Sequence, residues 1–189
     1  MQEKGMVRTF LSLKGNPRAC IWTEPLWGIP YNLVIPYASL YMEALGLSKV
    51  EIGALASIAL FVQIFGSVAS GALADKLGRR LCTLIFDCLC WSLPCLLWMG
   101  AQNYAWFLAA AFFFGLDRIT QNSWGLLLTE GQNPELVVRC YSLAQFMGPL
   151  SAFFAPLGKL AVDRYGLVPT VRVLYLIAAV MMTLKFVLL

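Results

Sequence analysis

The sequence contains no histidine among its 189 residues, and this absence removes several classes of catalytic site. A Ser-His-Asp triad, a Cys-His pair and every histidine-ligated metal site require an imidazole that the chain does not have. The 6 cysteines form no C-x-x-C pair, and four of them lie in the apolar stretch 81–100. The sequence therefore predicts no catalytic residues, no metal site and no cofactor, with the cysteines acting as small buried apolar side chains.

Charged residues are also scarce, at 13% of the chain, whereas hydrophobic residues make up 60% and the mean hydropathy is +0.73. A soluble domain of this length cannot bury so much apolar surface in one core, so the lipid bilayer is the expected solvent. The net charge of +4 is modest and no basic block interrupts a polar fold, which argues against nucleic-acid binding. No G-x-x-x-x-G-K-[ST] loop is present, which argues against direct use of ATP.

Long apolar stretches account for most of what remains. A helix that crosses a bilayer needs about 20 mainly apolar residues. After a cytoplasmic N-terminal segment, 1–18, hydropathy predicts an all-α membrane bundle over 19–189, with helices at 20–45, 52–74, 81–100, 104–129, 138–162 and 168–189. The connectors between these stretches are short, so consecutive helices are expected to be antiparallel neighbours.

The placement of Lys and Arg predicts how this bundle is oriented. The expected cytoplasmic side carries Lys4, Arg8, Lys14, Arg18, Lys76, Arg79, Arg80 and Arg139, and the opposite side carries Lys49, Lys159, Arg164 and Arg172. Because basic residues favour the cytoplasmic side, both termini are expected in the cytoplasm. The short loops favour the plasma membrane of a bacterium.

A charged and glycine-containing stretch, GALADKLGRR at 71–80, separates the second and third predicted helices. Its informative positions are Gly71, Asp75, Lys76, Gly78, Arg79 and Arg80. Gly71 would allow close approach of a neighbouring helix, and Gly78 would permit a sharp turn across a six-residue connection. Without further context, the three basic residues also fit a simple role as cytoplasmic membrane anchors.

This string, G-x-x-x-D-[RK]-x-G-R-R, resembles the signature loop of major facilitator superfamily transporters. The resemblance implies that the loop faces the cytoplasm. It also implies that Asp75 and the basic residues form a charge network that stabilises one conformation and breaks during switching.

A second copy of part of this pattern occurs later in the chain. Asp75-Lys76-Leu77-Gly78 follows the second predicted helix, and Asp163-Arg164-Tyr165-Gly166 follows the fifth. Equivalent positions in two sets of three helices predict two inverted three-helix repeats, the arrangement found within each half of these transporters. A coincidence of two Asp-basic-x-Gly turns is the alternative.

Several ionisable residues lie inside the predicted helices. Glu24, Asp87, Asp117 and Arg118 interrupt apolar stretches, and each charge costs roughly 3 kcal/mol at the middle of a membrane helix. Such residues persist where they are paired or face water, so they are candidates for a coupling or substrate pathway. Helical spacing places Asp117, Arg118, Gln121 and Asn122 in one polar sector, which we expect to line the interior.

Arg118-Ile119-Thr120-Gln121 also resembles the R-x-x-Q-G element found in the fourth helix of many members of this family. The resemblance implies proton coupling or substrate binding for Arg118, although Asn122 stands where the family has glycine. The alternative is a structural ion pair of Arg118 with a carboxylate of Asp117, Glu24 or Asp87.

The first predicted helix contains aromatic residues, an acid and three prolines, a combination that would suit a binding surface. Trp27, Tyr31 and Asn32 are the candidates for lining a cavity. Gln63, Trp91 and Gln145 are weaker candidates of the same kind. Trp22 also fits an interfacial aromatic belt.

The resemblance covers nearly the whole chain but only the first half of the twelve-helix family pattern. It implies secondary active transport of a small solute by alternating access, with protons as a candidate coupling ion. A second six-helix half, or a second copy of the chain, would complete the transporter, and the six helices alone are not expected to transport. The apolar end at Leu189 favours truncation.

Two other classes of function compete with transport. The main alternative is a non-transporting membrane interaction protein or an inactive truncated remnant. An intramembrane enzyme is disfavoured because Glu24, Asp87 and Asp117 are spread over three predicted helices.

Overall fold

The computed structural model describes residues 10–189, and within this range the chain is helical with no strand. Residues 1–9, which include half of the predicted cytoplasmic segment and the basic residues Lys4 and Arg8, lie outside the described residues. The main elements are α2 (Gly15–Val34), η1 (Ile35–Tyr37), α3 (Ala38–Ala44), α4 (Lys49–Leu77), α5 (Arg79–Asp87), η2 (Cys88–Ser92), α6 (Leu93–Met99), α7 (Tyr104–Phe114), α8 (Asp117–Leu128), α9 (Pro134–Ala152), α10 (Ala155–Tyr165) and α11 (Leu167–Leu188).

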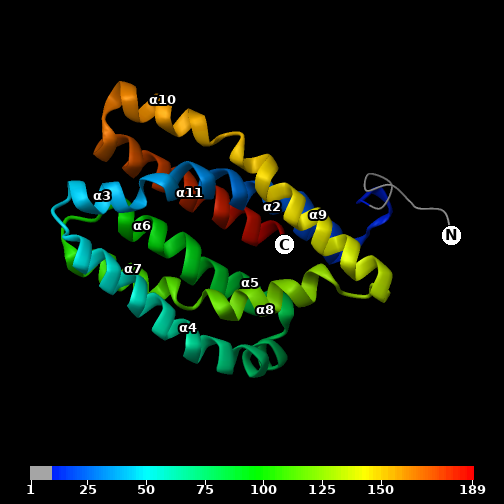
Figure 1. Cartoon of the computed structure of the whole chain (residues 1–189). Helices are drawn as coiled ribbons and strands as arrows, with labels where there is room; N and C mark the ends of the chain where they lie inside the picture. Colours follow the sequence, from blue (N-terminus) through cyan, green and yellow to red (C-terminus); the bar gives the residue numbers. More distant parts are fainter. Residues whose placement is uncertain (1–9) are drawn as a thin grey trace.

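The helices run back and forth along one long axis (Figure 1). The α4–α5 and α8–α9 connections lie at one end of the bundle, and the α3–α4, α6–α7 and α10–α11 connections lie at the other. Helix α2 packs against α9 and α11, whereas α8 packs against α4 and α5. The chain is therefore an antiparallel helical bundle in which α2, α8 and α11 contribute to the interior.

Three of the described helices are long and apolar enough to cross a membrane: Lys49–Leu77, Arg79–Met99 and Leu167–Leu188. The other three predicted ranges, 20–45, 104–129 and 138–162, are each divided into shorter helices. The divisions occur at η1, at the Gly115–Leu116 turn and at the Phe153–Phe154 turn. Three spanning helices therefore follow from length and composition, and six crossings stay a prediction.

Local sequence explains where α4 begins and ends. Ser48 and Glu51 form a reciprocal capping box at its start, which satisfies two backbone N–H groups of the first turn. The helix continues to Leu77, so Asp75 and Lys76 lie in its last turn, and the connection to α5 is the single residue Gly78. The predicted six-residue connection is therefore wrong, because a glycine at φ +81° can end one helix and begin the next by itself.

Gly166 makes the same one-residue connection between α10 and α11. Its dihedral angles are φ +86° and ψ 159°, compared with φ +81° and ψ 147° at Gly78. Asp163 and Arg164 lie in the last turn of α10, as Asp75 and Lys76 lie in that of α4. The two sequence-related hairpins therefore share one backbone conformation.

Close helix approach occurs at Gly115 and not at the predicted Gly71. A Cβ atom on Gly71 would have no heavy atom within 4 Å, so the expected close contact is not formed within residues 10–189. A Cβ atom on Gly115 would lie 2.5 Å from the Val62 side chain and 2.8 Å from the Ala59 carbonyl oxygen. The end of α7 therefore packs directly against the backbone of α4.

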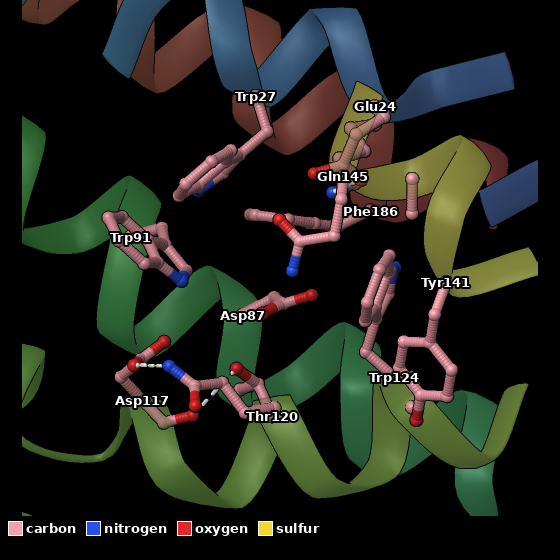
Figure 2. A pocket seen from close by; sticks show the side chains of 14 residues that line it. Glu24, Trp27, Asp87, Trp91, Asp117, Thr120, Trp124, Tyr141, Gln145 and Phe186 are labelled. Atoms are coloured by element: carbon pink, nitrogen blue, oxygen red, sulfur yellow. Dashed lines mark hydrogen bonds and ion pairs between the residues drawn. The ribbon is translucent and has the colours of Figure 1, made fainter. Parts of the chain in front are cut away.

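A π-helical segment, η2, interrupts the third predicted helix just before Pro94. Proline has no N–H, and its ring collides with the carbonyl group four residues earlier in a regular α-helix. The wider turn at η2 relieves this conflict, and the Leu93 N–H bonds to the Cys88 carbonyl oxygen five residues before it. Asp87 lies just before the π turn and Trp91 lies within it, and both side chains point into the interior (Figure 2).

Candidate functional site: a polar cavity inside the bundle

A cavity of about 450 Å³ lies inside the bundle between α2, α5, η2, α8, α9 and α11 (Figure 2). We call it the polar cavity, because carboxylates, amides and one ammonium group line it together with aromatic rings. Its lining residues are Glu24, Trp27, Asp87, Trp91, Asp117, Thr120, Gln121, Trp124, Gly125, Tyr141, Ala144, Gln145, Lys185 and Phe186. The sequence had singled out seven of these as site or weaker cavity candidates: Glu24, Trp27, Asp87, Trp91, Asp117, Gln121 and Gln145.

Two buried aspartates approach the cavity from different helices. Asp87 ends α5 and is 5% exposed, and Asp117 begins α8 and is 6% exposed. The Gly115–Leu116 turn starts a new helix at Asp117, so the carboxylate lies at a helix N-terminus, where backbone N–H groups favour negative charge. The side-chain amide of Gln121 donates a hydrogen bond to Asp117 Oδ2, which fixes the direction of that carboxylate.

A buried ion pair joins α2 to α11 in the wall of the polar cavity. Lys185 Nζ lies 2.8 Å from Glu24 Oε2, and the side chains are 5% and 14% exposed. The ammonium also lies 5.7 Å from the ring centre of Trp27 and 5.5 Å from that of Trp124. Both contacts fall within the roughly 6 Å range of cation–π attraction.

Lys185 is the functional candidate that sequence reasoning missed. It lies near the end of an apolar stretch, where a lysine is easily assigned to the membrane surface through its long side chain. Helix α11 instead continues to Leu188 and turns the ammonium inward. The overlooked signal was a second charge, 13 residues after Arg172, in a helix with no acid.

The predicted polar sector on α8 is divided between two environments. Asp117 and Gln121 line the polar cavity, whereas Arg118 and Asn122 do not. Arg118 is exposed and donates hydrogen bonds to Gln63 Oε1 at 3.3 Å and Gln121 Oε1 at 2.7 Å. Gln121 therefore connects the Arg118 guanidinium to the Asp117 carboxylate.

The direct ion pair considered for Arg118 is not found within residues 10–189. Glu24 pairs with Lys185, and the nearest acceptors of Arg118 are two amide oxygens. Asn122 donates a hydrogen bond to Ser70 Oγ on α4 at 3.3 Å. Arg118 and Asn122 therefore face the α4 side of α8.

Aromatic rings separate the polar cavity from a second, mainly apolar cavity of about 410 Å³. Trp91 lines both cavities. Its ring centre lies 5.1 Å from those of Trp27 and Phe114, and Trp27 stacks on Tyr31 at 4.6 Å. Tyr31 reaches the second cavity, so the two aromatic candidates of α2 face different spaces.

Asn32 lines neither of these two cavities. Its side-chain amide donates a hydrogen bond to the Gly28 carbonyl oxygen at 2.7 Å, so the amide bonds within α2 itself. Gln63, one of the weaker candidates, lines the second cavity.

The signature residues lie at the α4–α5 end of the bundle and are exposed. Arg79 lies 3.7 Å from Glu130, which follows α8, and Asn16 donates a hydrogen bond to the same carboxylate. Asp75 forms no ion pair within residues 10–189. The contact between these connections therefore runs through Arg79 and Glu130, and its exposure limits its contribution to about 0–1 kcal/mol.

The polar cavity has the composition of a non-covalent binding site. Polar groups converge on a space walled by aromatic rings, which is the usual character of small-molecule sites. No group of three or more His, Cys, Asp or Glu side chains in the described part of the chain is placed to hold a metal ion.

Comparison with known proteins identifies the family. Residues 26–189 match the sequence model of the Major Facilitator Superfamily. The chain belongs to this family. This major facilitator superfamily chain is also 33% identical over 165 residues to "Multidrug resistance protein MdtG" of Serratia proteamaculans (strain 568), and the match covers 84% of the chain and 39% of the relative.

Membership of the major facilitator superfamily establishes a multi-pass membrane protein of a transport family, in agreement with the resemblance seen in the signature loop. Members of this family are generally carriers, which is consistent with the expectation that the chain is not an enzyme. The chain spans 39% of the length of the relative it matches.

Proposed function

We propose that this chain forms one half of a secondary active transporter that moves a small solute by alternating access. The observation that carries the proposal is the polar cavity, in which buried Asp87 and Asp117 accompany the Glu24–Lys185 ion pair. Each such charge costs roughly 3 kcal/mol near the middle of a membrane helix. A bundle that needed only to fold would gain stability from apolar residues at these positions, so their presence supports a solute or ion pathway.

The proposed architecture is six membrane crossings arranged as two inverted three-helix repeats, with both termini in the cytoplasm and the bundle in the plasma membrane. The matching dihedral angles of Gly78 and Gly166 support the repeat. Their positions at opposite ends of the bundle in Figure 1 support the inversion. The helix break before Asp117 also agrees with this proposal, because discontinuous helices commonly form solute sites in transporters.

A second six-helix half, or a second copy of this chain, would complete the solute path. The exposed guanidinium of Arg118 supports this, because its two acceptors are neutral amide oxygens and it forms no ion pair within residues 10–189. We assign the second half to cover the α4 and α8 face that carries Arg118 and Asn122. Asp75 at the end of α4 and Arg79 at the start of α5 would then stabilise one of the two conformations.

Protons are the coupling ion that we propose, with Asp87 and Asp117 as the carboxylates that carry them. Both are buried in the polar cavity, where a proton or a solute must reach them through the same space. Arg118 is connected to Asp117 through Gln121, so protonation of the carboxylate would change the contacts of the guanidinium.

A chimera tests this function. Residues 1–189 are fused to the remaining part of the MdtG relative and expressed in bacteria that lack their own efflux pumps. Accumulation of one cationic, one anionic and one neutral dye is measured with and without a proton ionophore. We expect ionophore-sensitive movement of at least one dye, lost in Asp117→Asn and kept in Asp163→Asn, whose carboxylate is exposed on α10.

Normal amounts of the chimera in the membrane with dye accumulation equal to that of empty cells, for all three dyes, would contradict the proposed function.

A further inference from the structure

The environment of Lys185 is that of a bound organic cation. We propose that the Lys185 ammonium is a built-in substitute for the positively charged group of the solute, and that an organic cation binds by taking the Glu24 carboxylate from it. This inference rests on the proposed function, because it treats the polar cavity as the solute site.

The contacts of Lys185 provide the first argument. The ammonium has a carboxylate at 2.8 Å and the rings of Trp27 and Trp124 at 5.7 and 5.5 Å. Aromatic faces around a cation are the environment in which proteins bind substituted ammonium ligands, and here a carboxylate adds the counter-ion. The cation subsite is therefore already formed in the absence of a solute, and a side chain of the protein fills it.

The balance of charge provides the second argument. Three carboxylates line the polar cavity, those of Glu24, Asp87 and Asp117, against the single ammonium of Lys185. When Asp87 and Asp117 have released their protons, an anionic solute would add to this excess of negative charge, whereas a cationic solute would reduce it. Negative charge lining a low-dielectric cleft also raises the local concentration of cations.

Lys185 has an alternative partner once Glu24 is occupied. The carboxylate of Asp87 lines the same cavity as Lys185 and is 5% exposed. A lysine ammonium on a flexible four-carbon stem can exchange one carboxylate for another without movement of its helix. In the proposed binding step, Lys185 leaves Glu24 for Asp87, so the first carboxylate is freed and the ammonium stays paired.

The cavity also has room for the rest of such a ligand. Its volume of about 450 Å³ falls in the range of small-molecule sites, and Trp91 and Phe186 provide apolar surface next to the charged groups. Tyr141 and Gln145 are exposed at the α9 side of the cavity, where a solute could enter. The ligand class that fits is a small organic monocation with an apolar or aromatic part.

The test is binding of radiolabelled benzyltrimethylammonium to the purified 189-residue chain in neutral maltoside micelles, measured by equilibrium dialysis. We expect Lys185→Met to lower the Kd by about tenfold or more, because it removes the internal competitor and leaves the Glu24 carboxylate free. Lys185→Arg should bind as weakly as the unmodified chain. The double variant Glu24→Gln/Lys185→Met should lose the gain in affinity for the cation. The anion benzenesulfonate should bind no variant more tightly than it binds the unmodified chain.

Equal or weaker cation binding by Lys185→Met, in protein that keeps its helical circular dichroism, would overturn the inference. Binding of benzenesulfonate that disappears in Lys185→Met would also overturn it, because Lys185 would then contact an anionic solute directly. If Lys185→Met does not fold, Lys185→Gln replaces it with the same expected direction. If the chimera transports dye but Lys185→Met gains no affinity for the cation, only this inference is rejected. If Lys185→Met gains affinity but the chimera does not transport, only the proposed function is rejected.

Discussion

At the scale of the residue, one buried ion pair determines how the interior of the polar cavity is arranged. Glu24 and Lys185 bring opposite charges from α2 and α11 to within 2.8 Å, almost out of contact with solvent. The pair replaces part of the solvation that each charge loses. Removing one partner is therefore more costly than removing both, because the remaining charge is left buried without a partner.

Glu24→Gln is expected to destabilise the chain by about 3–5 kcal/mol, since it leaves the Lys185 ammonium without its carboxylate. The double variant Glu24→Gln/Lys185→Met is expected to recover most of this loss. Unfolding by sodium dodecyl sulfate in mixed micelles, followed by circular dichroism, measures both. If the double variant is as unstable as Glu24→Gln, the ion pair is not what holds these residues in the interior.

Residue types and helical spacing identified Glu24, Asp87 and Asp117 as intramembrane charges, and the structure brings all three to the polar cavity. The sequence did not predict which cation would meet them. Arg118 was the obvious choice because it neighbours Asp117, yet neighbours on a helix point about 100° apart. Lys185 is 161 residues from Glu24 in sequence, and only the packing of α11 against α2 brings them together.

At the scale of the element, breaks in helices position the cavity residues. The π turn η2 follows Asp87, and the Gly115–Leu116 turn precedes Asp117. Pro94 gives a reason for the first break, and the contact of Gly115 with α4 gives a reason for the second. The two breaks place both aspartates at helix ends inside the bundle.

Gly115→Ala is expected to destabilise the chain by about 1–3 kcal/mol, because its Cβ would collide with Val62 and the Ala59 backbone. The matched control is Gly71→Ala, where a Cβ meets no atom within 4 Å. The control substitution should not lower the free energy of unfolding, and the higher helix propensity of alanine is expected to raise it by up to about 1 kcal/mol. The same detergent unfolding assay compares the two. A Gly71→Ala chain that is less stable than Gly115→Ala would contradict the assigned packing of α4.

Hydropathy predicted where helices lie but not how they are divided. Stretches such as 104–129 read as one continuous helix because apolar composition does not reveal a single turn at Gly115. The one-residue hairpin at Gly78 was missed for a related reason. Asp75 and Lys76 are polar and were assigned to a loop, although they occupy the last turn of α4. Polarity marks the exit from the membrane, which need not coincide with the end of a helix.

At the scale of the whole molecule, polar groups gather inside while large apolar side chains cover much of the outside. Phe61, Phe65 and Val68 of α4 and Leu157 of α10 are among the exposed hydrophobic residues. A lipid environment accounts for these residues, in agreement with membership of a membrane transport family. The match covers 39% of the relative, so most of the relative's length lies outside the matched part.

The 189-residue chain alone is expected to bind but not to transport, because alternating access requires a second unit on the other side of the solute site. Proteoliposomes that contain only the 189-residue chain should show no uptake of the three dyes above that of empty liposomes. Uptake above this level would mean that the chain, alone or as a dimer, forms a complete pathway.

The most direct test of the account is the position of the two glycine hairpins relative to the membrane. Lys76→Cys and Arg164→Cys place a thiol at each exposed hairpin, and the unmodified chain is the control because its described cysteines are buried or half-buried. A membrane-impermeant maleimide is applied to intact cells and to permeabilised cells. The account predicts that Arg164→Cys reacts in intact cells and Lys76→Cys reacts only after permeabilisation. Reaction of both thiols from the same side of the membrane would contradict the inverted repeat and the six crossings of the proposed transporter half.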